Sequence, residues 1–283
     1  VDLPDLRNLA VSENPQARPN DGATVMIADK ESNTNDREHA AVSVQSVHKA
    51  YRNGTTTTPV LTGVDLVVRP GECVFLAGPS GSGKTTLLSI LGCILSADRG
   101  EVRILDQDVF ALSERRRAAL RRNRIGFVFQ RFHLIRGLTA SENVAVPLTL
   151  RTMSPRKARR RADSLLEAVG IADKANSHPA NLSAGQCQRV ALARALVGDP
   201  DLVLADEPTA SLDGANGQEV MALLRRLTTE KGKAAIVVTH DQRIFPFADR
   251  ILHLENGRIV RTTKPEPRAH SRDRSLEAGV GNP

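Results

Sequence analysis

Apolar segments along the chain predict two kinds of β-strand. Nearly continuous apolar runs lie at Val74–Ala77, Leu202–Ala205 and Ala234–Val238. Because a strand of a parallel sheet is covered on both faces, such runs are typical of the buried strands of an α/β protein. Apolar and polar residues alternate at Val42–Val47 and Val64–Val68, which predicts strands there as well.

Between these runs, apolar residues recur with helical spacing. Helices are expected at Thr85–Leu95, Ser154–Val169, Ser183–Val197 and Asn216–Leu227. The third helix opens on a serine that can cap its N-terminus. Residues from about 131 to 196 carry no strong strand signal, so this region is interpreted as a helical insertion between two halves of a sheet domain.

The two ends of the chain lack such patterns. Residues 1–40 and 264–283 are polar and without sustained periodicity, and we predict that they are disordered. The folded part is therefore expected to span residues 41–263. No run of 18 apolar residues occurs, and no basic segment followed by an apolar core opens the chain, so neither a membrane span nor a secretion signal is expected.

Composition narrows the class of ligand. The net charge is +7, although the first 40 residues carry eight acidic and only four basic side chains. The basic remainder suits an anionic ligand or an anionic membrane surface, with a solvated basic surface as the alternative. Aromatic residues make up 3% of the chain, too few for a surface that stacks single-stranded nucleic acid, so no nucleic-acid partner is expected.

The three cysteines indicate where the chain works. Cys73, Cys93 and Cys187 form no C-x-x-C pair, and their number is odd. This pattern favours a reducing, cytosolic setting without a disulfide framework or a zinc site.

A glycine-rich segment after the first apolar run gives the strongest chemical signal. Residues 78–85 fit the phosphate-binding loop pattern in full, between a predicted strand and a predicted helix. Its glycines let consecutive N–H groups point at phosphate oxygens, and the helix N-terminus adds a positive dipole. Lys84 is expected to reach the β- and γ-phosphates, and the Thr85 hydroxyl to ligate Mg²⁺. The nucleotide-binding residues expected here are Gly78, Pro79, Ser80, Gly81, Ser82, Gly83, Lys84, Thr85 and Thr86.

Two carboxylates follow a second apolar run. Leu202–Ala205 leads directly into Asp206 and Glu207. Asp206 is expected to hold Mg²⁺, and Glu207 to orient and polarise an attacking water as a general base. By itself this pattern is a common loop start, and it gains weight from the phosphate-binding loop upstream.

A serine and a glycine open the helix predicted at residues 183–197. In the segment Leu182–Gln186, Ser183 and Gly185 can form a second anion-binding site at the helix N-terminus. A plain serine-capped helix is the alternative interpretation.

Together these motifs resemble the ATP-binding subunits of ABC transporters. They are most similar to the branch that serves lipoprotein release, macrolide export and cell division. The resemblance spans about residues 41–263 and rests also on four segments in the family's order, at 125–130, 138–144, 206–213 and 238–241. It implies an α/β fold, with a P-loop NTPase core of the RecA-like type, an antiparallel β subdomain and an inserted α-helical subdomain.

The resemblance also implies roles that spacing does not supply. Gln130 is similar to the glutamine that contacts Mg²⁺ and water and senses the membrane partner, and His240 to the histidine that grips the γ-phosphate. Asp213 resembles an aspartate that acts across a dimer. Tyr51 lies where the family places an aromatic that stacks on adenine. The alternatives are a surface or capping role for His240 and simple packing for Tyr51.

In this family each ATP is sandwiched between two subunits. The resemblance therefore implies that Ser183, Gly185 and Gln186 contact the nucleotide held by a second copy of the chain. One departure is Ala184, which stands where the family usually has glycine. Alanine would be strained there if the position required a positive φ.

Two arginine-rich segments remain outside these motifs. They could face anionic lipid near a membrane partner, or they could be solvated helix faces. The first comprises Arg115–Arg117, Arg121, Arg122 and Arg124, and the second Arg151, Arg156, Lys157 and Arg159–Arg161.

The family resemblance implies an Mg²⁺-dependent ATPase that works as a homodimer. Its partner would be a separate integral membrane permease, and it would be cytoplasmic and peripheral on the inner face of the membrane. A transmembrane signalling or mechanical complex without a transported substrate is the alternative. A soluble DNA-repair or ribosome-associated ATPase is disfavoured, because the chain shows neither sustained heptads nor a second core.

Overall fold

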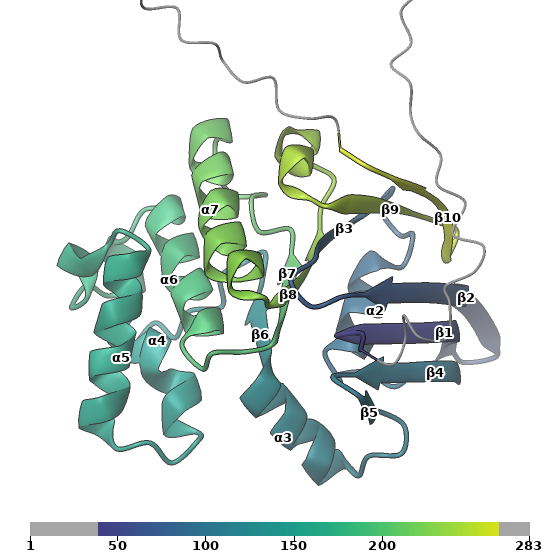
Figure 1. Ribbon diagram of the computed structural model, residues 1–283, viewed down its shortest axis with the longest axis horizontal. Helices are drawn as coiled ribbons and strands as arrows, with labels where there is room; N and C mark the ends of the chain where they lie inside the picture. The colour runs from purple at the N-terminus through teal and green to yellow at the C-terminus, as the bar shows by residue number, and fades with distance from the viewer. Residues whose placement is uncertain (1–38, 266–283) are drawn as a thin grey trace, which may run out of the picture.

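The computed structural model describes residues 39–265, which form two sheets with helices around them (Figure 1). The ends predicted to be disordered, residues 1–40 and 264–283, lie almost entirely outside the described residues. Within the described part of the chain, no helix is long and apolar enough to cross a membrane.

The larger sheet has six strands in the order β10-β9-β3-β8-β7-β6. All neighbours pair in parallel except β10, which runs antiparallel to β9. The apolar runs correctly predicted β3, β7 and β8, which are almost completely buried. The strands are β3 (Cys73–Ala77), β6 (Ile125–Val128), β7 (Leu202–Asp206), β8 (Ala234–Val238), β9 (Arg250–Glu255) and β10 (Arg258–Thr263).

The second sheet is antiparallel, in the order β2-β1-β4-β5, and confirms the expected antiparallel subdomain. The two alternating runs belong to its hairpin, in which Val42 pairs with Val68 and Asn53 with Thr56. The hairpin strands extend well beyond those runs. The strands are β1 (Val42–Asn53), β2 (Thr56–Val68), β4 (Arg99–Ile104) and β5 (Gln107–Asp108).

Within residues 39–265, six α-helices and four short 3-10 helices connect and cover the sheets. The α-helices are α2 (Lys84–Leu91), α3 (Glu114–Arg124), α4 (Ala140–Thr149), α5 (Pro155–Ala168), α6 (Ala184–Leu196) and α7 (Gly214–Leu227). The 3-10 helices are η1 (Ala172–Lys174), η2 (Pro179–Asn181), η3 (Thr229–Lys231) and η4 (Gln242–Phe247).

One predicted helix is shorter than expected. The helix predicted through Leu95 ends at Leu91, with Gly92 as its C-cap. A Cβ on Gly92 would lie 2.2 Å from the Phe127 ring, so the glycine allows the chain to pass close to β6. Cys93 then has a φ of 55°, which turns the chain out of the helix.

In the described part of the chain, three apolar cores hold these layers together. Alternate residues of β3 face opposite ways: Val74 and Leu76 pack with α2 and the antiparallel sheet, while Phe75 packs toward α7. The third core joins α4, α5 and α6, around Leu148, Leu166 and Val190. These helices form the separate layer at one side of Figure 1.

Both α4 and α6 begin with a reciprocal capping box. Thr139 and Glu142 form it on α4, and Ser183 and Gln186 form it on α6. In each box the side-chain oxygen of the first residue accepts the N–H of the third helical residue, whose own side chain accepts the N–H of the first. The start of α6 is therefore fixed by local hydrogen bonds.

Candidate nucleotide site

The predicted site residues of the large sheet meet where β3, β7 and β8 end. This convergence follows from the parallel sheet, because the carboxyl ends of its strands lie along one edge. They surround a pocket of about 690 Å³. It is lined by Tyr51, Val60, Gly78, Pro79, Ser80, Gly81, Gly83, Lys84, Thr85, Thr86, Gln130, Asp206, Glu207, Val238 and His240. The two valines were not predicted, because an apolar strand residue carries no chemical signal in the sequence.

The glycines of the loop between β3 and α2 permit close backbone contacts. A Cβ on Gly78 would lie 2.1 Å from the Leu254 carbonyl oxygen, and one on Gly83 would lie 2.8 Å from the Val60 carbonyl oxygen. The loop therefore packs directly against neighbouring backbone. Lys84 lies across it, and its Nζ donates to the carbonyls of Gly78 (2.9 Å) and Pro79 (2.8 Å).

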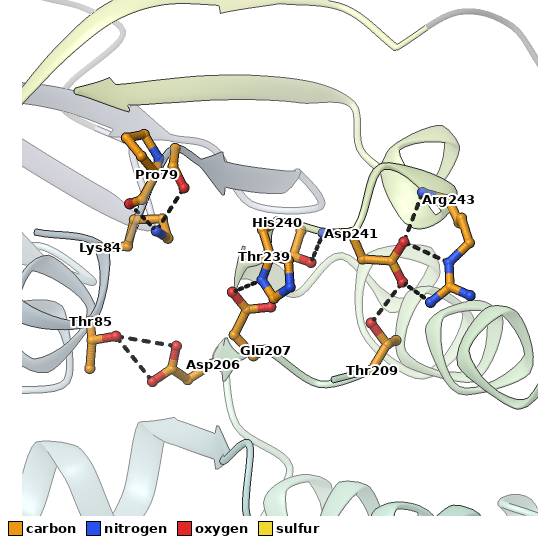
Figure 2. A network of polar contacts seen from close by, with 11 residues as sticks. Pro79, Lys84, Thr85, Asp206, Glu207, Thr209, Thr239, His240, Asp241 and Arg243 are labelled. Carbon is orange, nitrogen blue, oxygen red and sulfur yellow. Dashed lines mark hydrogen bonds and ion pairs between the residues drawn. The ribbon is translucent and has the colours of Figure 1, made fainter. Parts of the chain in front are cut away.

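Thr85 and Asp206 face each other across the pocket floor (Figure 2). The Thr85 hydroxyl lies 3.5 and 3.4 Å from the two carboxylate oxygens of Asp206. Burial raises the pKa of Asp206, and the neighbouring charge of Glu207 raises it further, while Thr85 and Lys84 lower it. A hydroxyl beside a desolvated carboxylate is a donor set that suits Mg²⁺, which prefers oxygen ligands.

Glu207 and His240 form a close pair beside this floor. The Nδ1 atom of His240 lies 2.7 Å from Oε1 of Glu207. Glu207 has a φ of 47°, and its N–H donates to the Val238 carbonyl at 2.9 Å. Its second oxygen, Oε2, is buried and has no hydrogen-bond partner among the described residues. Such an orphaned acceptor in a pocket can bind a water molecule.

A second polar network holds the loop that follows β8. Asp241 accepts from Nε and Nη2 of Arg243, both at 2.8 Å, and from the Thr209 hydroxyl at 3.4 Å. The guanidinium of Arg243 lowers the pKa of Asp241. The Asp241 N–H donates to Thr239 at 3.0 Å, which fixes the residue next to His240 (Figure 2). The sequence motifs assigned no role to this network, although Asp241 lies in a family segment.

Five predicted nucleotide contacts lie outside the pocket lining. Ser82 is buried, and its hydroxyl has no partner among the described residues. Asp213 caps α7 by accepting the Asn216 N–H at 3.0 Å, and Ser183 caps α6. Gly185 lies near the Asn216 side chain, which places the starts of α6 and α7 together. The remaining residue, Gln186, belongs to the α6 capping box.

Tyr51 and Gln130 border the pocket from other elements. Tyr51, in β1, is 47% exposed, which disagrees with a role in simple packing. Lys49 places its Nζ 5.9 Å from the centre of the Tyr51 ring. Gln130 follows β6 and is exposed.

The condition under which Ala184 would be strained, a positive φ, is not met. Ala184 is the first residue of α6, and it is not among the described non-glycine residues with positive φ. Alanine is well tolerated in a helical backbone, so the departure from the family pattern costs the fold nothing.

A phosphate-binding loop, an oxygen-rich floor and a Glu–His pair at one sheet edge define a nucleotide-binding P-loop NTPase. The ABC transporter family pattern matches residues 61–210. The chain belongs to this family, and its fold is that of an ATP-binding cassette.

Known relatives agree with this assignment. The chain is 45% identical over 220 residues to the macrolide export ATP-binding/permease protein MacB of Syntrophobacter fumaroxidans, which covers 77% of the chain and 31% of that protein. It is 44% identical to the ABC transporter ATP-binding protein MJ1508 of Methanocaldococcus jannaschii, covering 77% of the chain and 97% of that protein. The chain thus spans about a third of the length of the MacB relatives it matches.

A solved structure shows the same fold. It is a dimeric, post-hydrolysis state of the ATP-binding cassette MJ0796 bound to ADP and Pi. The TM-score is 0.74 at 42% identity, and the match covers 79% of this chain and 98% of that one.

Proposed function

We propose that the chain is the ATP-hydrolysing subunit of an ABC transporter, which dimerises around two ATP molecules and drives a separate membrane permease. It would be peripheral on the inner face of the cell membrane. The observation that carries the proposal is the Glu207–His240 pair, at 2.7 Å, in one pocket with the phosphate-binding loop and Asp206.

Each part of the pocket has a role in this proposal. Residues 78–86 bind the phosphates through backbone N–H groups, and Tyr51 stacks on the adenine ring. When the nucleotide binds, Lys84 Nζ gives up its hydrogen bonds to the two loop carbonyls and donates to phosphate oxygens instead. Thr85, Asp206 and Gln130 would hold Mg²⁺. When bound, this ion would neutralise charge on the β- and γ-phosphates.

The chemical step uses the Glu207–His240 pair. Glu207 accepts a hydrogen bond from the attacking water through its unpartnered Oε2, which orients and polarises that water. His240 holds the other carboxylate oxygen and, from its exposed position, reaches the γ-phosphate.

A second copy completes the site. We assign Ser183, Gly185, Gln186 and Asp213 to contacts with the nucleotide bound in the other subunit. In support, these residues lie outside the pocket of their own chain, and Ser183 and Asp213 are exposed. The MJ0796 cassette is a dimer in the solved structures.

A groove of about 540 Å³ is the proposed contact with the permease. Its lining includes Ile94 and Leu150, which are 58% and 63% exposed, although both are apolar. Exposed apolar residues that share one groove are typical of an interaction site. Phe129, immediately before Gln130, also lines it, so the groove adjoins the nucleotide pocket.

Of two alternative functions, one is compatible with the same site and the other is disfavoured by the helices. A signalling or mechanical complex would use the same ATPase, and the partner's identity would separate it from a transporter. A DNA-repair type would require a long coiled coil between the phosphate-binding loop and Ser183. In that interval the longest described helix is α5, with 14 residues, so the described structure disfavours this type.

The Glu207→Gln variant tests the proposal. The amide keeps the size of the side chain but is a far weaker base. We expect Mg²⁺-dependent ATP hydrolysis to fall by at least about 100-fold, while ATP binding persists and traps a dimer. Phosphate release measures the rate, and size-exclusion chromatography with ATP measures the dimer.

The control is Glu101→Gln, which changes an exposed glutamate of β4. It should hydrolyse ATP at the wild-type rate. If Glu207→Gln is as fast as the wild type, the role of Glu207 is wrong. The trapped dimer also provides bait: affinity capture from membranes, followed by identification of the bound protein, tests the permease assignment.

A further inference from the structure

The turn that carries Gln130 has a backbone that needs support from outside. Phe132 and His133 are consecutive non-glycine residues with φ of 58° and 47°. The Phe132 N–H donates to the Phe129 carbonyl at 3.1 Å, so Gln130 lies inside this turn. A left-handed backbone disfavours residues that have a Cβ, and two in succession persist only where the surroundings hold them.

Arg194 of α6 supplies that support. Its Nη1 donates to the His133 carbonyl and its Nη2 to the Phe132 carbonyl, both at 2.6 Å. Two successive left-handed residues direct their carbonyls to the same side, where the planar fork of an arginine can bind both. A lysine ammonium has no such fork.

Among the described residues, no acidic group competes for this arginine. Arg194 is partly buried, and burial lowers the pKa of its guanidinium. Within residues 39–265 no carboxylate forms an ion pair with it, whereas Arg189, on the same helix, pairs with Glu219. A desolvated cation without a counter-ion is costly unless its donors are used, and here they are used on the Gln130 turn.

The helix between Ser183 and Arg194 is firmly packed. Leu192 packs in the core with the parallel sheet, and Val190 in the core of α4 and α5; both are completely buried. A helix rises 1.5 Å per residue, so the capped start of α6 and Arg194 are about 16 Å apart on one rigid rod.

We infer that Arg194 is a positioning residue that fixes Gln130 to α6. The residue that faces the nucleotide from one side is thereby joined to the helix that begins at Ser183. Because Leu192 packs α6 in the core with the parallel sheet that carries Asp206, this link holds Gln130 in place relative to Thr85 and Asp206. The inference rests on the proposed function, in which Gln130 acts at the nucleotide.

The first test replaces Arg194 with lysine in the full chain, which keeps the charge but removes the fork. We expect kcat for ATP to fall about tenfold because Gln130 is misplaced, while KM changes less than about twofold because the phosphate-binding loop and Tyr51 are unchanged. The matched control is Arg189→Lys. Arg189 also donates to a backbone carbonyl, that of Val169 at 2.8 Å, but does not bond to the turn. Its kcat should stay within about twofold of wild type.

A double-mutant cycle separates positioning from a general loss of structure. If Arg194 acts through Gln130, adding Arg194→Lys to Gln130→Ala lowers kcat no further. An equal loss in both backgrounds, or an unchanged kcat in Arg194→Lys alone, would overturn the inference. Should the lysine variant not fold, Arg194→Gln is tested by the same criteria. A wild type without Mg²⁺-dependent hydrolysis would instead overturn the proposed function.

Discussion

Two glycines of the phosphate-binding loop show how different the demands on single residues are. Gly78 and Gly81 both have positive φ, at 153° and 79°. A Cβ on Gly78 would collide with the Leu254 carbonyl oxygen at 2.1 Å, whereas one on Gly81 meets nothing within 4 Å. Glycine is therefore required at position 78 both by the positive φ and by the lack of space for a Cβ. At position 81 it is required by the positive φ alone.

The two alanine variants should differ in stability. Gly81→Ala should lower the free energy of unfolding by about 1–2 kcal/mol, the cost of a left-handed alanine. Gly78→Ala should lower it by about 2–4 kcal/mol, because the backbone of β9 must also move. Urea denaturation without nucleotide measures both. Equal losses would show that the Leu254 contact relaxes without cost.

At the residue scale, motif chemistry predicted much of the site. Lys84, Thr85, Asp206 and Glu207 all line one pocket, as expected from a strand–loop–helix unit and an acidic strand end. Arg194 could not be found in this way, because its partners are main-chain carbonyls and a sequence does not show where those point. The same holds for the left-handed backbone at Phe132 and His133.

At the scale of elements, α4 and α6 carry the same capping box but differ in what lies beyond it. Thr139 and Glu142 cap α4, and Ser183 and Gln186 cap α6. Only the α6 box belongs to the segment that we assign to the nucleotide of a second copy. The pair therefore allows the structural value of a cap to be measured separately from its role in the dimer.

Ser183→Ala and Thr139→Ala should each cost the monomer about 1 kcal/mol, the usual value of a lost N-cap. In the Glu207→Gln background, only Ser183→Ala should also weaken the ATP-dependent dimer. Chemical denaturation gives the first quantity, and analytical ultracentrifugation with ATP gives the second. A dimer equally weakened by both changes would contradict the assignment of Ser183.

Strand prediction succeeded where a continuous or alternating apolar run is long enough to recognise, and it failed for strands that are very short or lie at the exposed edge of the sheet. The strands β3, β7 and β8 are central, and their continuous apolar runs reveal them. Strand β6 is only four residues long and contains Gly126, which the Ala195 carbonyl approaches too closely for any side chain. Strand β10 lies at the sheet edge and is largely exposed, so solvent contact leaves it no apolar pattern.

At the scale of the whole molecule, the proposed permease groove adjoins the nucleotide pocket but shares no lining residue with it. It lies between α3 and the α4–α6 layer, with Arg121, Arg122 and Arg151 among its lining residues. Arg151 donates to the carbonyls of Arg122 and Gly198, so the two arginine-rich segments meet at this groove. Contact of these segments with anionic lipid stays a prediction.

Leu150→Asp should separate coupling from catalysis. A charge in an apolar contact should reduce capture of the membrane partner by at least about tenfold. ATP hydrolysis by the isolated chain should be unchanged. Val260→Asp is the matched control, because Val260 is 54% exposed on β10, outside the groove lining. Capture that survives Leu150→Asp would locate the permease contact elsewhere.

The left-handed conformation of Glu207 places backbone stability and catalysis in conflict at one position. Glycine, and to a lesser degree asparagine, would relax this backbone by roughly 1 kcal/mol, yet neither can replace the carboxylate. Selection for thermal stability alone would therefore favour replacement of Glu207, although ATP hydrolysis would be lost. Glu207 is retained only where ATP hydrolysis itself is under selection. Where that selection is relaxed, we expect the cassette to become more stable and to lose its ATPase activity.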